Sequence, residues 1–280
     1  MTSQSALYIV PTPLGNLADM SIRAIDTLKQ VQHIAAEDTR HSGKLLSHHG
    51  INTPLISYHD HGGDAQLNRI LGLLKGGDSV ALISDAGTPL ISDPGYRLVS
   101  EVRREGFSVV PIPGACALVA ALCASGLPSD RFSFEGFPPA KSQARLRVYE
   151  SLAADERTLI FYESTHRIED SLVDMVKAFG ADRMAVIARE LTKTFETFLH
   201  APLEDLLKQL QEDANQKKGE FVVLVHGAVL EKSEGLDAES ERVLSLLLGE
   251  LPLKQASALA AKITGEKKNK LYQWALDQKG

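Results

Sequence analysis

The sequence predicts an α/β protein made of two α/β domains, the first with a parallel sheet and the second with a mixed sheet, followed by a small helical domain. Short apolar runs alternate with helical patterns up to residue 126, which is typical of a parallel sheet. Prolines and basic residues interrupt this alternation over 127–141, and only helical patterns follow residue 237. We therefore expect domains at 1–127, 128–230 and 231–280.

The first domain is expected to hold five strands, because five short apolar runs stand between helical patterns. These runs cover 7–10, 33–36, 55–58, 80–84 and 109–112. Helices are expected over 21–30, 67–74, 96–106 and 114–125. The last of these is rich in alanine and ends at Gly126. Cys116 and Cys123 share one face of it, so they are expected to behave as small apolar residues.

The second domain is expected to be a mixed α/β domain, because a second set of strand-like runs and helical patterns follows residue 158. Strands are predicted over 158–162, 184–188, 195–199 and 221–225, and helices over 168–179 and 203–211. After a polar connector at 226–235, helices are predicted from 237, over 252–264 and over 268–277. Gly265 ends the second of these, so the last two helices resemble a helix-turn-helix.

The composition excludes several classes of protein. A chain of 280 residues that is 44% hydrophobic can bury a large core, which excludes a disordered chain. Its apolar runs are far shorter than the roughly 18 residues of a membrane span, and residues 1–5 lack a signal pattern, so we expect a cytoplasmic protein. Two cysteines support neither a disulfide framework nor a zinc site, and the histidines at 48–61 lack metal-site spacing.

The net charge of −6 means that any nucleic-acid partner must be bound by a local basic patch. Two stretches could supply one. The predicted RNA-binding residues are Lys141, Arg145 and Arg147 in the first stretch and Lys262, Lys267, Lys268 and Lys270 in the second, which also holds Tyr272 and Trp274. A solvated helix face near the terminus is the alternative interpretation of the second stretch.

Three loops that leave predicted strands carry the residues of a binding site. The loop at 84–95 is rich in glycine, proline and carboxylates, and it lies where open parallel sheets bind ligands. The loop at 11–16 is stiffened by two prolines, and a rigid turn without a ligand is its alternative interpretation. The segment 36–41 concentrates charge, for which an ion pair between Asp38 and Arg40 is the simpler explanation.

Common nucleotide-binding and hydrolase motifs are absent. No glycine is followed two positions later by another, so there is no G-x-G-x-x-G fingerprint, and there is no G-x-x-x-x-G-K-[ST] phosphate loop. The segment 77–81 approaches a G-x-S-x-G elbow, but it lacks the last glycine and precedes its strand. Rossmann-type dinucleotide enzymes, P-loop enzymes and serine hydrolases are therefore disfavoured.

Five phrases in order resemble the bacterial family of 16S ribosomal RNA 2'-O-ribose methyltransferases I. They are LYIVPTPLGN at 7–16, AEDTR at 36–40, SDAGTPLISDPG at 84–95, PIPGA at 111–115 and FYESTHR at 161–167. This family resembles the wider tetrapyrrole methylases, which implies S-adenosylmethionine bound in a cleft between two α/β domains, usually in a homodimer. It further implies 2'-O-methylation of a cytidine in the decoding region, position 1402 in the usual rRNA numbering, within the small ribosomal subunit.

The sequence departs from the tetrapyrrole enzymes at 11–13 and 87–89, where they tend to have a glycine-rich turn and Gly-Asp-Pro. By matching position, the resemblance suggests that the cofactor cleft is lined by Leu14, Asp85, Gly87, Ile91, Cys116, Ala117, Phe161, Leu191 and Phe221. We expect the Asp85 carboxylate to accept a hydrogen bond from the cofactor or to fix the loop that does, because charge-assisted hydrogen bonds are strong.

Methylation of a ribose hydroxyl needs in-line positioning, and a general base or a cation beside the oxygen would help. The candidates are Glu37, Asp38, Arg40, Glu163, His166, Arg167, Glu190 and Lys193. Among these we favour Glu163 and Lys193 from the second domain, with Glu37 and Arg40 from the first. The alternative functions are a methylase of a tetrapyrrole precursor, which would not need the helical tail, and a ribosome-binding module that keeps the fold without the activity.

Overall fold

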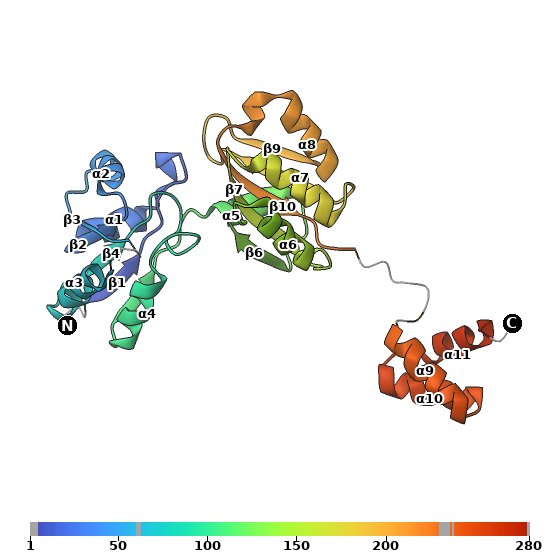
Figure 1. Cartoon of the computed structure of the whole chain (residues 1–280). Helices are drawn as coiled ribbons and strands as arrows, with labels where there is room; N and C mark the ends of the chain where they lie inside the picture. The colour runs from blue at the N-terminus through green and yellow to red at the C-terminus, as the bar shows by residue number, and fades with distance from the viewer. Residues whose placement is uncertain (1–4, 60–62, 230–235, 237, 279–280) are drawn as a thin grey trace. The chain divides into compact units, whose positions relative to one another are not determined.

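The computed structural model describes residues 5–59, 63–229, 236 and 238–278 (Figure 1). The chain divides into two compact units, Met1–Ala228 and Val229–Gly280, and each is described by itself. The first unit contains two five-stranded sheets, and the second is helical.

The first sheet is parallel throughout and has the strand order β3-β2-β4-β1-β5. Its strands are β1 (Ala6–Ile9), β2 (His33–Ala36), β3 (Leu55–Ser57), β4 (Val80–Leu82) and β5 (Ser108–Pro111). The five predicted strands are thus confirmed. Because β1 and β4 are neighbours, the loops that follow them leave the same edge of the sheet side by side, where open α/β sheets bind ligands.

Helices cover both faces of this sheet, as a doubly wound domain requires. They are α1 (Ile22–Gln30), α2 (Thr39–His48), α3 (Gly63–Lys75) and α4 (Tyr96–Arg104). The side chains of Ile70 in α3 and Leu98 in α4 pack in the core of one face. Leu28 in α1 and Leu46 in α2 pack in the core of the other.

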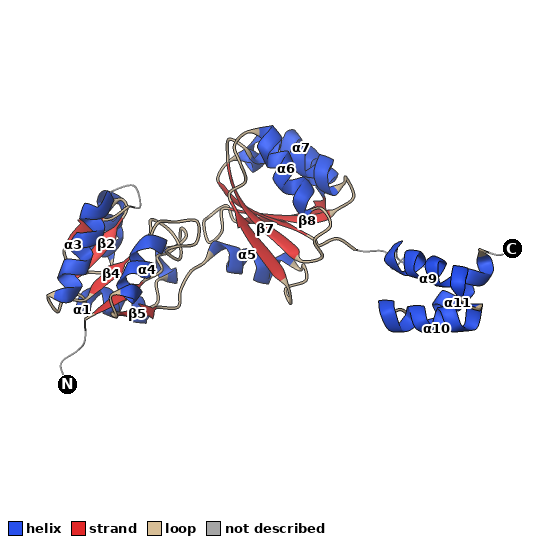
Figure 2. Ribbon diagram, turned by 60° about the horizontal axis from the view of Figure 1, so that its bottom comes forward, coloured by secondary structure: helices blue, strands red, loops and turns tan. Residues whose placement is uncertain are grey.

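The second sheet has the order β6-β7-β10-β8-β9, and it is mixed, as predicted, because only β6 and β7 are parallel. Its strands are β6 (Phe132–Gly136), β7 (Thr158–Ser164), β8 (Met184–Arg189), β9 (Thr197–Pro202) and β10 (Glu220–Val225). The helices that cover it are α5 (Ala117–Ser125), α6 (Ser142–Leu152), α7 (Ile168–Phe179) and α8 (Leu203–Glu212). Helix α5 lies on one face and α6 and α7 on the other (Figure 2).

Three segments differ from the sequence prediction. Residues 39–48, for which no element was predicted, form helix α2, and the Asp38 carboxylate caps it by accepting hydrogen bonds from the backbone N–H groups of Arg40 and His41 at 2.8 and 3.1 Å. The stretch 127–141 includes strand β6, and a helix, α6, follows it directly. The strand expected over 195–199 is β9 and begins at Thr197.

The second unit consists of α9 (Ala238–Glu250), α10 (Leu253–Thr264) and α11 (Lys268–Asp277). Leu244, Ala260 and Leu271 form its core, one from each helix. Gly265 adopts a left-handed conformation with φ +78° and ends α10, as predicted, so a three-residue turn joins α10 to α11. Among the described residues of both units, no helix combines the length and apolar character that crossing a membrane requires.

Candidate functional site

Backbone and side-chain hydrogen bonds tie together three loops at the carboxyl edge of the first sheet. Thr12 and Gly87 exchange both backbone hydrogen bonds at 2.9 Å, which joins the loop after β1 to the loop after β4. The Thr88 hydroxyl donates to the carbonyl of Ala115 at 2.8 Å, which adds the loop before α5. The phrases 7–16, 84–95 and 111–115, distant in sequence, therefore form one continuous structure.

Two loops near this edge hold the strained non-glycine backbone of the described residues. Among the described non-glycine residues, the four with positive φ are Leu90, Ser92, Glu190 and Thr192, at +74°, +60°, +51° and +64°. The first pair lies in the loop after β4 and the second pair in the loop after β8. Non-glycine residues in this conformation cost of order 1 kcal/mol or more each and cluster at ligand sites. Both loops therefore have the character of a binding site.

A cavity of about 480 Å³ lies between these loops, and we call it the carboxylate cavity. Its apolar lining consists of Leu14, Ile91, Ala117, Phe137, Tyr162, Leu191, Phe221 and Val222. Its acidic lining consists of Asp85, Asp93, Glu163 and Glu220. No lysine or arginine is present among the described residues that line it. Its volume suits a small organic ligand, and its charge favours a ligand with positive centres.

Glu163 is the most buried of these carboxylates, with an exposed fraction of 2%. Its Oε1 atom accepts a hydrogen bond from the backbone N–H of Ser164 at 2.9 Å and lies 3.2 Å from Nε of Arg167. Its Oε2 atom is buried and has no hydrogen-bond partner among the described residues. Since an unpaired buried carboxylate oxygen is costly, this atom is a ready acceptor for a ligand N–H or O–H group.

The Asp93 carboxyl of the cavity has a raised pKa. Burial raises its pKa to about 6, a hydrogen bond with Ser84 opposes the shift, and the carboxylates of Glu37 and Asp85 add to it. A carboxyl that titrates near neutral pH beside other acids is a common feature of functional sites. Asp93 lies within the 84–95 phrase, but it is not among the cofactor residues that the resemblance suggests.

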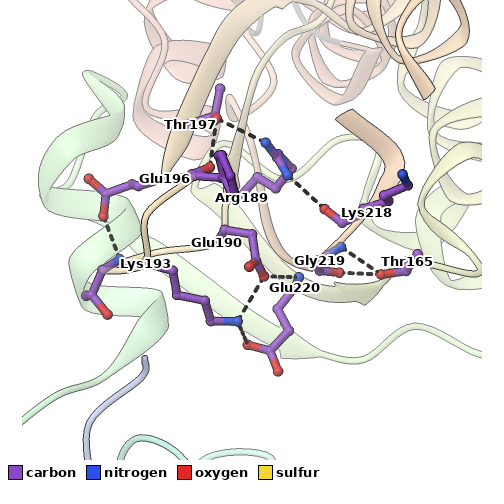
Figure 3. Close-up of polar contacts among 11 residues, drawn as sticks. Thr165, Arg189, Glu190, Lys193, Glu196, Thr197, Lys218, Gly219 and Glu220 are labelled. Carbon is purple, nitrogen blue, oxygen red and sulfur yellow. Dashed lines mark hydrogen bonds and ion pairs between the residues drawn. The ribbon is translucent and has the colours of Figure 1, made fainter. Parts of the chain in front are cut away.

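Lys193 belongs to a cluster of charged side chains (Figure 3) whose member Glu220 lines the cavity. Its Nζ atom donates to Oε1 of Glu190 at 2.8 Å and to Oε2 of Glu220 at 2.9 Å. Partial burial lowers the pKa of Lys193, but these two carboxylates outweigh that effect and hold the pKa above its ordinary value. Lys193 is therefore a fixed cation at neutral pH.

Two glycines allow the close packing of this cluster. A Cβ atom added to Gly15 would lie 2.4 Å from Cγ of Lys193, and one added to Gly219 would lie 2.5 Å from the Glu190 side chain. Gly219 also has φ +108°, and its N–H and carbonyl both bond the Thr165 hydroxyl. The loops after β1 and β8 and the turn before β10 are thereby held against one another.

The structure brings together most of the cofactor-binding residues that the resemblance suggested. Those that line the carboxylate cavity are Leu14, Asp85, Gly87, Ile91, Ala117, Leu191 and Phe221. Phe161 is not part of the lining: its ring packs against Tyr149 and Phe179 in the core of the other face of the sheet, and its neighbour Tyr162 lines the cavity. Cys116 is next to the lining residue Ala117 but is not part of the lining.

Tyr162 and Phe137 are site residues that the sequence analysis missed. The Tyr162 hydroxyl accepts a hydrogen bond from the backbone N–H of Leu118 at 3.1 Å, which fixes the start of α5, and its ring meets Phe137 edge to face. Burial is the main cause that raises the pKa of Tyr162, so the phenol stays protonated. The continuous apolar run of β7 gave no signal to separate Tyr162 from Phe161.

The predicted catalytic candidates separate into two groups. Glu163 and His166 line the cavity, while Arg167 pairs with Glu163 and Glu190 with Lys193. Glu37 and Arg40 do not line it. The Arg40 side chain is 93% exposed, and its Nε atom lies 3.9 Å from Oδ1 of Asp38.

The structure removes Arg145 from the predicted RNA-binding surface. Its side chain is 3% exposed, and Nε and Nη2 both donate to Oδ2 of Asp174, at 3.0 and 2.7 Å. A guanidinium buried in this way cannot reach a phosphate. Lys141 and Arg147, which flank it, are exposed.

Most of the predicted basic residues of the second unit are accessible. Lys262, Lys267 and Lys268 are exposed at the end of α10 and the start of α11, whereas Lys270 pairs with Glu266 at 2.9 Å. Trp274 is half-buried and donates from Nε1 to Oε1 of Glu241 at 3.1 Å, so its indole belongs to the helical core.

The chain matches two families of known proteins. Residues 6–207 match the Tetrapyrrole (Corrin/Porphyrin) Methylases, and residues 234–279 match the RsmI C-terminal HTH domain. Among solved structures it resembles cobalt precorrin-4 methyltransferase, with a TM-score of 0.60 and 16% identity over 81% of this chain and 96% of that one. It also resembles diphthine synthase, with a TM-score of 0.58 and 15% identity over 79% and 90%. These two similarities concern the fold.

Sequence relatives are much closer. The Ribosomal RNA small subunit methyltransferase I of Escherichia coli O157:H7 is 55% identical, over 99% of this chain and 97% of the relative. The protein of the same name from Pseudomonas aeruginosa is 54% identical over 99% of both chains. With both α/β sheets and the helical unit matched in one alignment, the chain belongs to the ribosomal RNA small subunit methyltransferase I family, within the tetrapyrrole methylase fold.

Proposed function

We propose that this chain transfers the methyl group of S-adenosylmethionine to the 2'-hydroxyl of a cytidine in the decoding region of 16S ribosomal RNA. The proposal combines family membership with one observation, the charge of the carboxylate cavity. The methylation of a tetrapyrrole precursor is less well supported, because the relatives that match the whole chain are ribosomal RNA enzymes and residues 234–279 match their C-terminal domain.

The residues of the carboxylate cavity fit this cofactor. S-adenosylmethionine carries a sulfonium and an ammonium group, and the cavity offers acidic side chains without an opposing lysine or arginine among its described lining residues. The free Oε2 atom of Glu163 suits an ammonium or ribose donor. Leu14, Ile91 and Leu191 offer apolar contacts, and the rings of Phe137 and Tyr162 offer flat surfaces for an adenine.

The bound cofactor would supply an electrophilic methyl group, and the chain would supply position and charge. Correct alignment of two reactants alone can lower a barrier by about 7–11 kcal/mol, which fits loops held by paired backbone hydrogen bonds. Lys193, a fixed cation, is suited to stabilising negative charge on the attacking oxygen rather than to accepting its proton. Among the acids of the cavity, Glu163 remains the favoured catalytic candidate. Glu37 and Arg40 do not line the cavity, so any catalytic part they play would be from outside it.

The cations proposed to contact RNA are Lys141, Lys262, Lys267, Lys268 and Lys270, now without Arg145. We also propose that the chain forms a homodimer. Helix α5 carries no charged residue, and it buries Leu118 and Leu122 on its sheet side while Val119 is 49% exposed on the other. A helix that is apolar on all sides usually has a second partner, which a second copy of the chain would provide.

The pH dependence of cofactor affinity is expected to follow Asp93. With a pKa of about 6, this carboxyl is largely neutral at pH 5 and ionised at pH 7.5, so it attracts a cation only at the higher pH. Calorimetry should therefore show tighter S-adenosylmethionine binding at pH 7.5 than at pH 5, and Asp93→Asn should flatten this difference. A wild-type affinity that is independent of pH over this range would contradict the assignment.

The Asp93 carboxyl is expected to affect the stability of the folded chain in the opposite direction, so that stability falls where cofactor affinity rises. The folded pKa of Asp93 lies above the ordinary value of 3.8, so the folded chain binds more protons than the unfolded chain between about pH 4 and pH 6. The contribution of Asp93 to the free energy of unfolding therefore falls as the pH rises through this window. At pH 7.5 without cofactor, Asp93→Asn should melt at a higher temperature than the wild type.

The deciding experiment is incubation of the protein with labelled S-adenosylmethionine and small-subunit particles from cells that lack this modification. Mapping of the 2'-O-methyl positions should then show a single modified cytidine at position 1402. Methylation at another base or at another ribose position would overturn the specificity. Cofactor binding without any methyl transfer would favour a ribosome-binding module that keeps only the fold.

A further inference from the structure

A second cavity, of about 460 Å³, adjoins the carboxylate cavity. The two share the lining residues Leu14, Asp85, Ala86 and Glu220, so they meet at the loop after β4. The other walls come from the loop after β1, from Lys193 and from helix α2. We call this space the basic cavity, because its charges differ from those of its neighbour.

Helix α2 supplies the basic wall. His41, Lys44 and Leu45 line the cavity, and their spacing of three and four residues places them on one face of the helix. The helix, TRHSGKLLSH, contains basic residues and no aspartate or glutamate, although the whole chain has a net charge of −6. Among the described residues, neither His41 nor Lys44 forms a side-chain ion pair, and both are exposed. This face is therefore free to bind an anion.

The remaining walls limit what that anion can be. Pro13, Leu14 and Leu17 from the loop after β1, with Leu45 opposite, give the cavity an apolar part. Lys193 also lines this cavity, and ion pairs with Glu190 and Glu220 hold its ammonium group in place (Figure 3). A ligand with one flat apolar part and one anionic part matches this arrangement and the volume of the cavity. A nucleotide has both parts.

We propose that the basic cavity binds the target nucleotide of the RNA strand, with a flanking phosphate at His41 and Lys44 and its ribose beside Asp85. This rests on the proposed function, because the acceptor must lie next to the methyl donor. Asp85 lines both cavities and thus marks the boundary that the ribose oxygen must reach. A base that is turned out of its stack can be held in such a space by apolar contacts, as single-stranded RNA commonly is.

The first test is steady-state methylation of the small-subunit particle by Lys44→Ala and His41→Ala variants of the full chain. Each loss of a phosphate contact should raise the KM for the particle about 5- to 10-fold, and Lys44→Ala, which removes a full positive charge, should also lower the salt dependence of binding by about one unit in slope. The affinity for S-adenosylmethionine should be unchanged, and Lys44→Arg should retain most of the wild-type KM.

Lys29→Ala is the matched control. Lys29 is exposed at the end of α1, directly before β2 begins, so it lies at the opposite edge of the sheet from the ligand loops. It should leave the KM unchanged. Suppose that the wild type methylates the particle and that Lys44→Ala and His41→Ala have the same KM as Lys29→Ala. The proposed site is then wrong, while the proposed function stands.

A second measurement does not depend on methyl transfer. Fluorescence anisotropy with a labelled single-stranded oligoribonucleotide that contains cytidine should show weaker binding to the double variant His41→Ala/Lys44→Ala than to wild type and to Lys29→Ala. Equal binding by all three would overturn the basic cavity as the nucleotide site, whether or not the particles are methylated. Weaker binding in the absence of any methylation would retain the site and overturn the proposed function.

Discussion

Replacing Arg145 with alanine is expected to lower the free energy of unfolding of the first unit by about 3 kcal/mol, because the buried Asp174 carboxylate would lose its buried partner and keep only the exposed Lys177, at 3.4 Å, as a charged neighbour. Burial opposes the ionisation of Asp174, but hydrogen bonds from Ser142 and Arg145 hold its pKa below the ordinary value. Thermal and urea unfolding followed by circular dichroism should show the loss.

The control for this prediction is Arg147→Ala, an exposed arginine on the same helix, which should change stability by less than about 0.5 kcal/mol. Arg145→Met combined with Asp174→Leu should recover much of the loss, since an apolar pair can replace a buried ion pair. The single tryptophan, Trp274, lies in the second unit, so its fluorescence transition should not move. A loss below about 1 kcal/mol for Arg145→Ala would contradict the importance of the pair.

Replacing Glu163 with glutamine is expected to weaken S-adenosylmethionine binding by about 10- to 100-fold, the effect of one charge-assisted hydrogen bond. Glutamine keeps the shape of the side chain and can still accept from the Ser164 N–H, but it removes the buried negative charge. Calorimetry should show the weaker binding. The control is Glu169→Gln on α7, which breaks a half-exposed ion pair with Lys217 and should bind the cofactor as the wild type does.

Single-turnover methylation at saturating cofactor separates two roles for Glu163. A rate close to that of wild type would make it a cofactor-binding residue. A rate reduced by about 100-fold or more would give it the proton-accepting role. If both the affinity and the rate of Glu163→Gln match wild type, Glu163 has no part in the site.

The parallel sheet and the two main ligand loops could be predicted from the sequence because each strand is a short apolar run and because glycine and proline follow β1 and β4. The face of the sheet on which each β7 side chain lies could not be predicted in this way. Residues 158–162 are almost continuously apolar, so the alternation that separates the two faces of a strand is missing, and Phe161 was chosen where Tyr162 lines the cavity.

Two further errors have the same kind of cause. The partner of Arg145 is 29 positions away along the chain, so a basic stretch could not be recognised as part of a buried pair. Residues 39–48 have few apolar side chains and contain Gly43, so helix α2 was not recognised, and with it the alignment of His41, Lys44 and Leu45 on one face. The basic cavity became visible only once that helix was known.

The acidic lining of the carboxylate cavity has a consequence for turnover. Methyl transfer converts the positively charged sulfonium of the donor into a neutral thioether, so the spent cofactor has one positive centre fewer than the fresh one. A cavity with Asp85, Asp93, Glu163 and Glu220 in its lining is expected to hold the donor more tightly than this product. Product inhibition would then be weak, and exchange of spent for fresh cofactor would be favoured by the same charges that select the donor.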